Sequence, residues 1–166
     1  QQDELQAFED VLEQALSRQG RKVLRWALDW TGGQPYLTQK LCAEIIEQAS
    51  GNLSERDLSE LVENLFLGDK ARTETNLRSI RDRTSGNPYV ARMLRIYKKV
   101  LKGKEVVSKE RSIEQNELKL TGLVKVNSQG NLLVRNRIYA RTFDLAWTKD
   151  NTPVTAGQRM SVVLSV

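Results

Sequence analysis

Few side chains in this protein are of the types that carry enzyme chemistry. Its 166 residues include no histidine and one cysteine, Cys42. Ser-His-Asp and Cys-His catalytic sites, and metal sites built from histidine or clustered cysteine, are therefore excluded. Carboxylate pairs such as Glu60 and Glu63 lie on the expected solvated faces of amphipathic helices, whereas paired catalytic acids need burial to separate their pKa values. We expect no catalytic residue, no metal site and no enzymatic activity here.

A phosphate-binding loop is absent from the sequence as well. The single Gly-Lys pair is Gly103-Lys104, and Lys98 stands where such a loop would need its first glycine. Without that loop, backbone N–H groups cannot cradle phosphates and no Ser or Thr is placed for Mg²⁺. No apolar strand ends in an Asp that could hold the metal. The sequence thus predicts no cofactor for this chain taken alone.

The most distinctive short pattern is the corner Thr31-Gly32-Gly33-Gln34-Pro35-Tyr36. Glycine is typical of the end of one helix, and proline of the first turn of the next. A similar string, Thr-Ser-Gly-Asn-Pro-Tyr, returns at residues 84–89. Turn chemistry alone can produce both strings. A purely structural corner is therefore one interpretation, and a binding role needs support from the rest of the chain.

The first half of the chain has the apolar periodicity of amphipathic helices throughout. Val11 belongs to the expected inward stripe of the first helix, and Ser54 is the expected N-cap of the fourth, with Asp57 at its third position. Six helices are expected in this half. The first ends near Gly20, the second carries residues 23–30, and the third runs from about 35 to 49. The fourth follows Ser54, and the fifth and sixth cover roughly 73–83 and 88–102.

The second half changes its pattern after residue 102. A short strand at 106–107 precedes a helix that begins with the capping-box pattern of Ser112 and Gln115 and runs to about residue 121. Two apolar runs, 123–126 and 132–135, flank a Gly-containing turn and predict a β-hairpin. A last helix, capped by Asn136, is expected to carry Ile138, Tyr139, Phe143, Ala146 and Trp147. This order is typical of a winged helix-turn-helix, and an unrelated small α+β cap is the alternative.

The last residues form a separate stretch. Residues 150–157 resemble a linker, and the apolar residues 160–166 are too few to span a bilayer, which takes about 20 apolar residues. We expect an unstructured tail, with a membrane helix continuing beyond Val166 as the alternative. Since the chain does not begin with Met and shows no signal-peptide pattern, we expect it to be an excised or processed piece of a longer protein, with a cytoplasmic location.

Charge is distributed unevenly along the chain. Residues 1–68 hold 6 Lys/Arg against 12 Asp/Glu, and residues 69–166 hold 20 against 9. A basic second half could meet nucleic acid, an anionic membrane surface, an acidic partner or the acidic first half. Candidate residues for a nucleic-acid or partner surface are Lys98, Lys99, Lys102, Lys104, Lys119, Arg135, Arg137 and Arg141. The three arginines among them could dock on an acidic partner or on residues 1–68.

Three stretches together resemble one known family. They read T-G-G-Q-P-Y-L-T-Q-K-L-C from residue 31, L-R-S-I-R-D-R from residue 77, and L-K-L-T-G-L-V-K-V-N-S-Q-G-N-L-L-V-R-N-R-I-Y-A-R-T-F from residue 118. The chain resembles, over roughly residues 20 to 147, the C-terminal half of cyanobacterial AAA-like proteins of the STAND class of P-loop signalling ATPases. The resemblance implies a mainly α fold, with a helical lid-like bundle over 1–86, a winged helix-turn-helix with a small β-hairpin wing over 87–149, and a tail over 150–166.

This resemblance also implies a site and partners. In the family, a G-G-x-P turn opens a lid helix against the bound nucleotide, so Gly33, Gln34, Pro35 and Tyr36 would form the nucleotide-facing corner. ATP or ADP would bind in the full protein, together with an upstream P-loop domain. The winged helix would relay nucleotide state to a downstream module and other protein partners. The chain would then be a non-catalytic regulatory fragment.

DNA binding by the winged helix is the alternative function. It would need a recognition helix that offers polar side chains to base edges. The helix after Ser112 carries Gln115, Asn116 and Lys119, but also Glu114 and Glu117. Two carboxylates facing a phosphate-rich groove are repulsive, so the sequence favours protein contacts over DNA.

Overall fold

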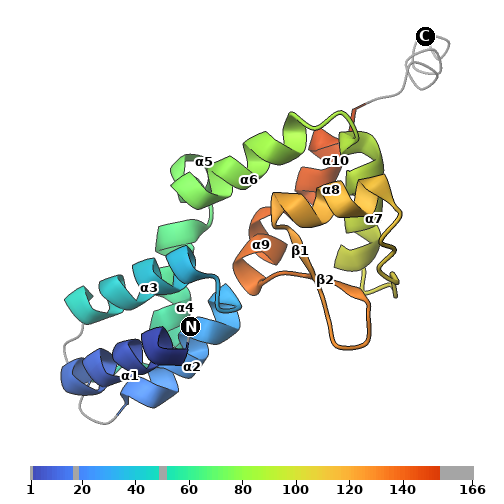
Figure 1. Cartoon of the computed structure of the whole chain (residues 1–166). Helices are drawn as coiled ribbons and strands as arrows, with labels where there is room; N and C mark the ends of the chain where they lie inside the picture. Colours follow the sequence, from blue (N-terminus) through green and yellow to red (C-terminus); the bar gives the residue numbers. More distant parts are fainter. Residues whose placement is uncertain (1, 17–18, 49–51, 154–166) are drawn as a thin grey trace, which may run out of the picture. The chain divides into compact units, whose positions relative to one another are not determined.

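The computed structural model, drawn in Figure 1, describes residues 2–16, 19–48 and 52–153. The chain is mainly helical and carries a small two-stranded antiparallel hairpin, as the sequence predicts. It forms two compact units, neither of which is continuous in sequence. The first holds Gln1–Ile80 and Arg135–Thr142, and the second holds Arg81–Val134 and Phe143–Val166. The domain boundaries that the sequence predicts, between residues 86 and 87 and between 149 and 150, stay predictions.

The first unit is built from helices around α2. Its elements are α1 (Gln2–Leu16), α2 (Gly20–Thr31), α3 (Pro35–Gln48), α4 (Glu55–Phe66), α5 (Lys70–Thr73), the start of α6 (Thr75–Ser85) and α9 (Arg137–Thr142). Helix α2 packs against α1, α3, α4 and α9. Since α9 follows the hairpin in sequence but packs here, the core of the first unit is completed by a distant part of the chain.

Local hydrogen bonds place several of these helices where the sequence predicts them. Ser54 caps α4, and a reciprocal capping box with Asp57 is present. One expectation is wrong, and the boundary of one helix is shifted. Val11, expected to face inward on α1, is 45% exposed. The helix expected over 73–83 begins at Thr75 and follows a separate short helix, α5, because Glu74 adopts an extended backbone conformation between them.

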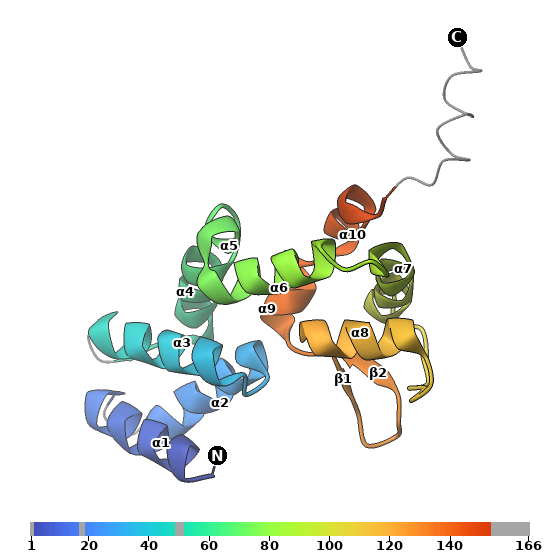
Figure 2. The same cartoon turned by 45° about the horizontal axis from the view of Figure 1, so that its top comes forward.

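The second unit combines helices with the hairpin. It contains α7 (Val90–Leu101), α8 (Ile113–Thr121), β1 (Val124–Val126), β2 (Leu132–Val134) and α10 (Leu145–Asn151). Helix α7 packs against α8, β2 and α10, and α8 packs against β1. Figure 2 shows the hairpin beside α8. Strand β1 pairs with β2 in the register Lys125 with Leu133, and the strand expected at 106–107 is present as one bridge, from Val107 to Asn131.

The prediction of a single last helix after Asn136 is wrong, because the segment forms two helices, α9 and α10. Asn136 does cap α9, because its side-chain oxygen accepts a hydrogen bond from the Tyr139 N–H at 2.8 Å. The helix ends at Thr142, and Asp144 adopts an extended conformation and caps α10 by accepting from the Trp147 N–H. The side chain of an Asp can replace a helical backbone bond in this way. The two helices consequently belong to different compact units.

The tail expected over 150–166 is described only in part. Asp150 and Asn151 form the last residues of α10. Residues 154–166, with the apolar stretch, lie outside the described part of the chain. In the described part, no helix is long and apolar enough to cross a membrane.

Candidate functional site

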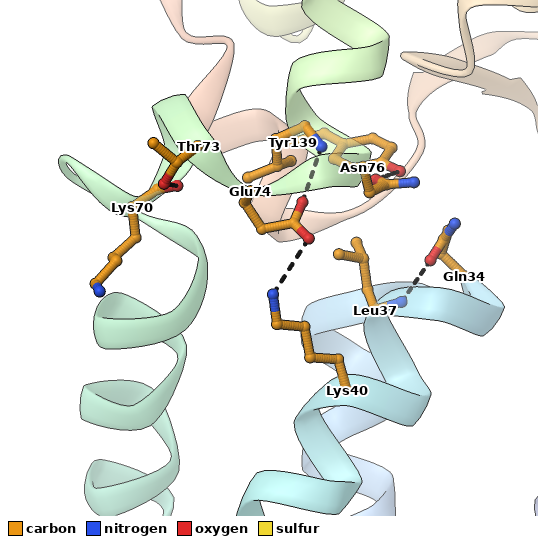
Figure 3. Close-up of polar contacts among 9 residues, drawn as sticks. Gln34, Leu37, Lys40, Lys70, Thr73, Glu74, Asn76 and Tyr139 are labelled. Carbon is orange, nitrogen blue, oxygen red and sulfur yellow. Dashed lines mark hydrogen bonds and ion pairs between the residues drawn. The ribbon is translucent and has the colours of Figure 1, made fainter.

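The corner between α2 and α3 is built by glycine and a glutamine cap. Gly32 has a φ of 58° and donates its N–H to the carbonyl of Leu28 at 2.8 Å, which closes α2. Pro35 begins α3, and the side-chain oxygen of Gln34 accepts a hydrogen bond from the Leu37 N–H at 2.6 Å (Figure 3). These bonds satisfy helix-end groups that would otherwise lack partners.

The four residues expected to face a nucleotide differ in exposure and in whether their side chains are already hydrogen-bonded. The side-chain oxygen of Gln34 is occupied by the cap. Gly33 is half-buried, and a Cβ added to it would meet nothing within 4 Å. Pro35 and Tyr36 are exposed, Tyr36 by 41%. The corner therefore offers a proline and an aromatic ring for contact, and its role towards a nucleotide stays a prediction.

Gly32 has a second role that the sequence does not reveal. A Cβ at this position would lie 2.7 Å from the carbonyl oxygen of Arg135 and 2.9 Å from the Cβ of Asn136. The corner therefore lies directly against the segment that leads into α9. A residue with a side chain would face both a strained φ and a steric clash at this point.

Next to the corner, an ion pair joins the partly exposed Lys40 of α3 to the buried carboxylate of Glu74, the residue before α6. The Glu74 side chain is 1% exposed, and one of its oxygens lies 3.3 Å from Nζ of Lys40. The other oxygen accepts from the Leu77 N–H at 2.9 Å and so caps α6. Figure 3 shows Lys40 reaching Glu74 from the helix that the corner begins. Since a buried carboxylate is costly without a partner, Lys40 is committed to this pair.

Lys40 also lies near two aromatic rings. Its Nζ is 5.8 Å from the ring centroid of Tyr36 and 5.6 Å from that of Phe66. These are favourable cation–π distances. Neither Lys40 nor Glu74 stood out in the sequence, because they are 34 residues apart and only the tertiary fold brings them together.

Within the first unit, a tyrosine joins α9 to the start of α6. The hydroxyl of Tyr139 donates to the side-chain oxygen of Asn76 at 2.7 Å. Burial raises the pKa of Tyr139 to about 12, although the charge of Arg135 and the hydrogen bond with Asn76 lower it in part. The tyrosine is therefore a neutral hydrogen-bond donor at physiological pH.

Two of the candidate arginines contact the acidic residues of the first unit. Arg137 pairs with Asp29, and its Cζ lies 3.9 Å from the centroid of the Trp30 ring. Arg141 pairs with Glu63. Of the roles that the sequence left open for these arginines, the structure places them on residues 1–68. Arg135 is half-buried just before α9.

The candidate lysines lie in the second unit. Helix α7 buries Met93, Leu94, Tyr97 and Val100, and the lysines at 98, 99, 102 and 104 are exposed. Lys119 is half-buried on α8. Near the start of α7, Arg92 pairs with Glu114 at 3.1 Å. The exposed lysines form no ion pair with any other described residue.

Most polar side chains of α8 are engaged inside the second unit. Gln115 is buried, and its amide accepts from the Lys109 N–H at 2.6 Å and donates to the Val107 carbonyl at 3.2 Å. Ser112 caps the helix by accepting from the Gln115 N–H. The side chain of Gln115 thus holds the preceding segment rather than closing the capping box expected with Ser112.

The other polar residues of α8 are used in the same way. Asn116 donates to the Glu110 carbonyl at 2.6 Å, and Glu117 accepts from the side chain of Asn87 at 2.7 Å. Hydrogen bonds from its own N–H, then from Arg92 and Ser112, lower the pKa of Glu114. Of the three side chains that the DNA-binding alternative would offer to bases, Gln115, Asn116 and Lys119, the first two are therefore engaged within the second unit.

Two apolar side chains are exposed on α8. Ile113 is 54% exposed and Leu120 is 70% exposed, and their spacing of seven residues places them on one face of the helix. Exposed apolar residues of this kind are typical of contacts with proteins rather than with base edges.

The described residues contain no group of three or more His, Cys, Asp or Glu side chains that could hold a metal ion. Since this observation covers only the described residues, the expectation that the chain has no metal site stays a prediction.

A curated protein is similar to this chain in sequence. An uncharacterized WD repeat-containing protein of the cyanobacterium Synechocystis is 32% identical over 137 residues, which cover 76% of this chain. The match covers 11% of that protein, so the chain spans about a tenth of its length. No family model matches the chain. No solved structure matches it either.

Proposed function

We propose that this chain is a non-catalytic regulatory part of a larger signalling ATPase of the AAA-like, STAND type. In this proposal the first unit is a helical lid whose corner, with Pro35 and Tyr36 exposed, contacts a nucleotide-binding P-loop domain elsewhere in the protein. The second unit is a winged helix that binds protein modules. ATP or ADP would bind to the full protein and not to this chain alone.

One observation carries the protein-binding part of the proposal. On α8, Gln115, Asn116 and Glu117 are engaged in hydrogen bonds within the second unit, while Ile113 and Leu120 are exposed. A helix that reads DNA needs free polar groups, whereas exposed apolar side chains favour burial against a protein.

The similar Synechocystis protein supports a role as one module among several. It is much longer than the matched segment, and its name refers to WD repeats. Such repeats form β-propellers. We infer that this chain, too, works within a longer protein and contacts neighbouring modules.

The protein-binding role is tested by replacing Leu120 with Glu. The chain and the remaining part of its parent protein are expressed separately, and their association is measured by calorimetry. We expect L120E to weaken association by at least about tenfold, because a charge would enter an apolar contact. Val11→Glu is the matched control, since Val11 is also exposed and apolar but lies on α1. Equal affinity of L120E and the unmodified chain would overturn the role of α8.

The lid role has its own test in the longer protein. Substitution of Gly33 or Pro35 by Ala is expected to weaken nucleotide binding or change nucleotide exchange. Unchanged nucleotide affinity in both variants, with the fold intact by circular dichroism, would remove the corner from the site.

DNA binding remains the second candidate, because phosphate contacts need exposed cations and the second unit carries several exposed lysines. A gel-shift titration with duplex DNA at several salt concentrations tests it. Absence of a shift even at low salt would eliminate this candidate.

A further inference from the structure

The solvent face of α7 carries a row of exposed cations. Arg95, Lys98, Lys99 and Lys102 are exposed, and Lys104 follows just after the helix. Steps of three, four and seven residues place the first four on one helix face, opposite the buried residues of α7. None of the five forms an ion pair with another described residue.

Five cations of the first unit form ion pairs. There Arg21 pairs with Glu9, Lys40 with Glu74, Arg56 with Glu60, Arg137 with Asp29, and Arg141 with Glu63. By sequence, the first unit holds 12 Lys/Arg against 14 Asp/Glu, a net of −2, and the second holds 14 against 7, a net of +7. The positive charge of the protein is therefore concentrated in the unit that contains α7.

The row is unfavourable for the isolated helix. Like charges three or four residues apart repel one another, as Arg95 does with Lys98 and Lys99. The helix dipole favours cations in the last turn, which explains Lys98 and Lys99. It does not explain Arg95, which lies further from that end. An anionic partner on this face would relieve the repulsion.

The form of the row indicates a polypeptide rather than DNA as that partner. From Arg95 to Lys102 it covers about 10 Å along a single helix, given a rise of 1.5 Å per residue. DNA recognition would also place an element in a groove, and the exposed side of the neighbouring α8 presents the apolar Ile113 and Leu120. A second helix with carboxylates at the same spacing would match the row charge for charge.

We propose that the solvent face of α7 binds an acidic helical segment of a protein partner, with Asp or Glu at i, i+3 or i+4, and i+7. The attraction is electrostatic, so binding weakens as salt rises. This surface is separate from the apolar face of α8, and the proposal stands on the charges of α7 alone.

The test uses the full 166-residue chain and a fluorescein-labelled synthetic helix with Glu at those positions and Ala elsewhere. Fluorescence anisotropy measures its binding at several salt concentrations. The triple variant K98E/K99E/K102E is expected to bind about tenfold or more weakly, because three attractions become repulsions. A peptide with Lys in place of Glu is expected to bind this variant and not the unmodified chain.

A matched control reverses three exposed cations of the first unit, as R25E/K70E/R78E. It changes the net charge by the same amount and is expected to bind the Glu peptide within about twofold of the unmodified chain, apart from long-range attraction that salt screens. Thermal melts followed by circular dichroism verify that both triple variants remain folded. Leu120→Glu is expected to leave peptide binding unchanged, so failure of the protein-binding role of α8 is distinguishable from failure of this proposal.

Three outcomes would overturn the proposal. The Glu peptide does not bind even at low salt, or it binds the α7 triple variant as well as the unmodified chain. In the third outcome, a short random-sequence DNA duplex or a phosphatidylserine vesicle binds more tightly than the peptide at equal salt, and the triple variant abolishes that binding. The face would then be a surface for nucleic acid or for a membrane.

Discussion

The two Gly-x-Pro-Tyr corners share most of their letters but not their backbone. In the corner at residues 31–36, Gly32 and Gly33 both have positive φ values, and Gln34 caps a helix that begins at once with Pro35. In the corner at residues 84–89, Gly86 is not among the glycines with positive φ. There Pro88 and Tyr89 form a turn before α7 begins at Val90.

The polar residues of the two corners, Gln34 and Asn87, also differ in how far along the chain their hydrogen-bond partners lie. Gln34 bonds locally to the Leu37 N–H. Asn87 accepts from the Tyr89 N–H at 2.9 Å and donates to Glu117 on α8 at 2.7 Å. The first corner is thus fixed by its glycines and the second by its asparagine. Similar strings therefore do not imply similar sites.

The largest expected difference is between alanine at Gly32 and alanine at Gly86. G32A meets both a positive φ and the Arg135 carbonyl at 2.7 Å, whereas a Cβ at Gly86 lies 3.1 Å from the Asp82 carbonyl. We expect G32A to lower the free energy of unfolding by about 3 kcal/mol or more and G86A by about 1 kcal/mol. Urea denaturation measures both. Equal losses would show that the two corners are built alike.

The next effect concerns the buried hydroxyl of the first corner. Thr31 and Thr38 share a hydrogen bond of 2.7 Å between buried side chains. T31V would leave the Thr38 hydroxyl without that partner, at a cost of about 1–3 kcal/mol in unfolding free energy. The double variant T31V/T38V is expected to recover part of the loss. A thermodynamic cycle with T38V measures the coupling, and a coupling near zero would contradict the bond.

Alanine at the capping residues should affect the second corner more than the first. N87A removes a backbone cap and the bond to Glu117, so we expect a loss of about 1–2 kcal/mol. Q34A removes one local cap, and we expect about 0.5–1 kcal/mol. The free energy of unfolding of E117Q, measured alone and together with N87A, tests whether the bond to α8 explains why N87A loses more stability than Q34A. A larger loss in Q34A would reverse the comparison.

The smallest effect at neutral pH comes from Cys42, which lies on the helix that the first corner begins. Burial raises the pKa of its thiol from 9.0 to about 11. The folded state therefore favours the protonated thiol, and this contribution is complete below pH 9 and is lost as pH rises towards about 11. Denaturation curves across this range should fall less steeply with pH in C42A than in the unmodified chain. Parallel slopes would show that the thiol is accessible.

Many helix boundaries could be predicted because short-range hydrogen bonds set them. Gly32 ends α2, Ser54 caps α4, and Ser112 caps α8 through groups within a few residues. Such bonds form between neighbours in the chain, so residue type and spacing suffice to predict them. The hairpin follows for the same reason, since its turn is local.

The candidate site was less predictable, because its chemistry depends on partners far away in sequence. Arg137 and Asp29 are 108 residues apart, and Lys40 and Glu74 are 34 apart. The sequence offered Gln115 as a candidate for base contacts in the DNA-binding alternative, yet its side chain is buried and bonds to the backbone of Val107 and Lys109. No local pattern distinguishes a displayed polar group from an engaged one.

The sequence by itself determined that the protein is mainly helical, where several helices begin, and that a small hairpin is present. Tertiary structure alone decided that α9 completes the first unit, that Arg137 and Arg141 pair with acidic residues there, and that the cations of α7 remain exposed. The physical reason is range. Helix and turn formation depend on groups a few residues apart, whereas burial and charge pairing depend on which distant segments the fold brings together.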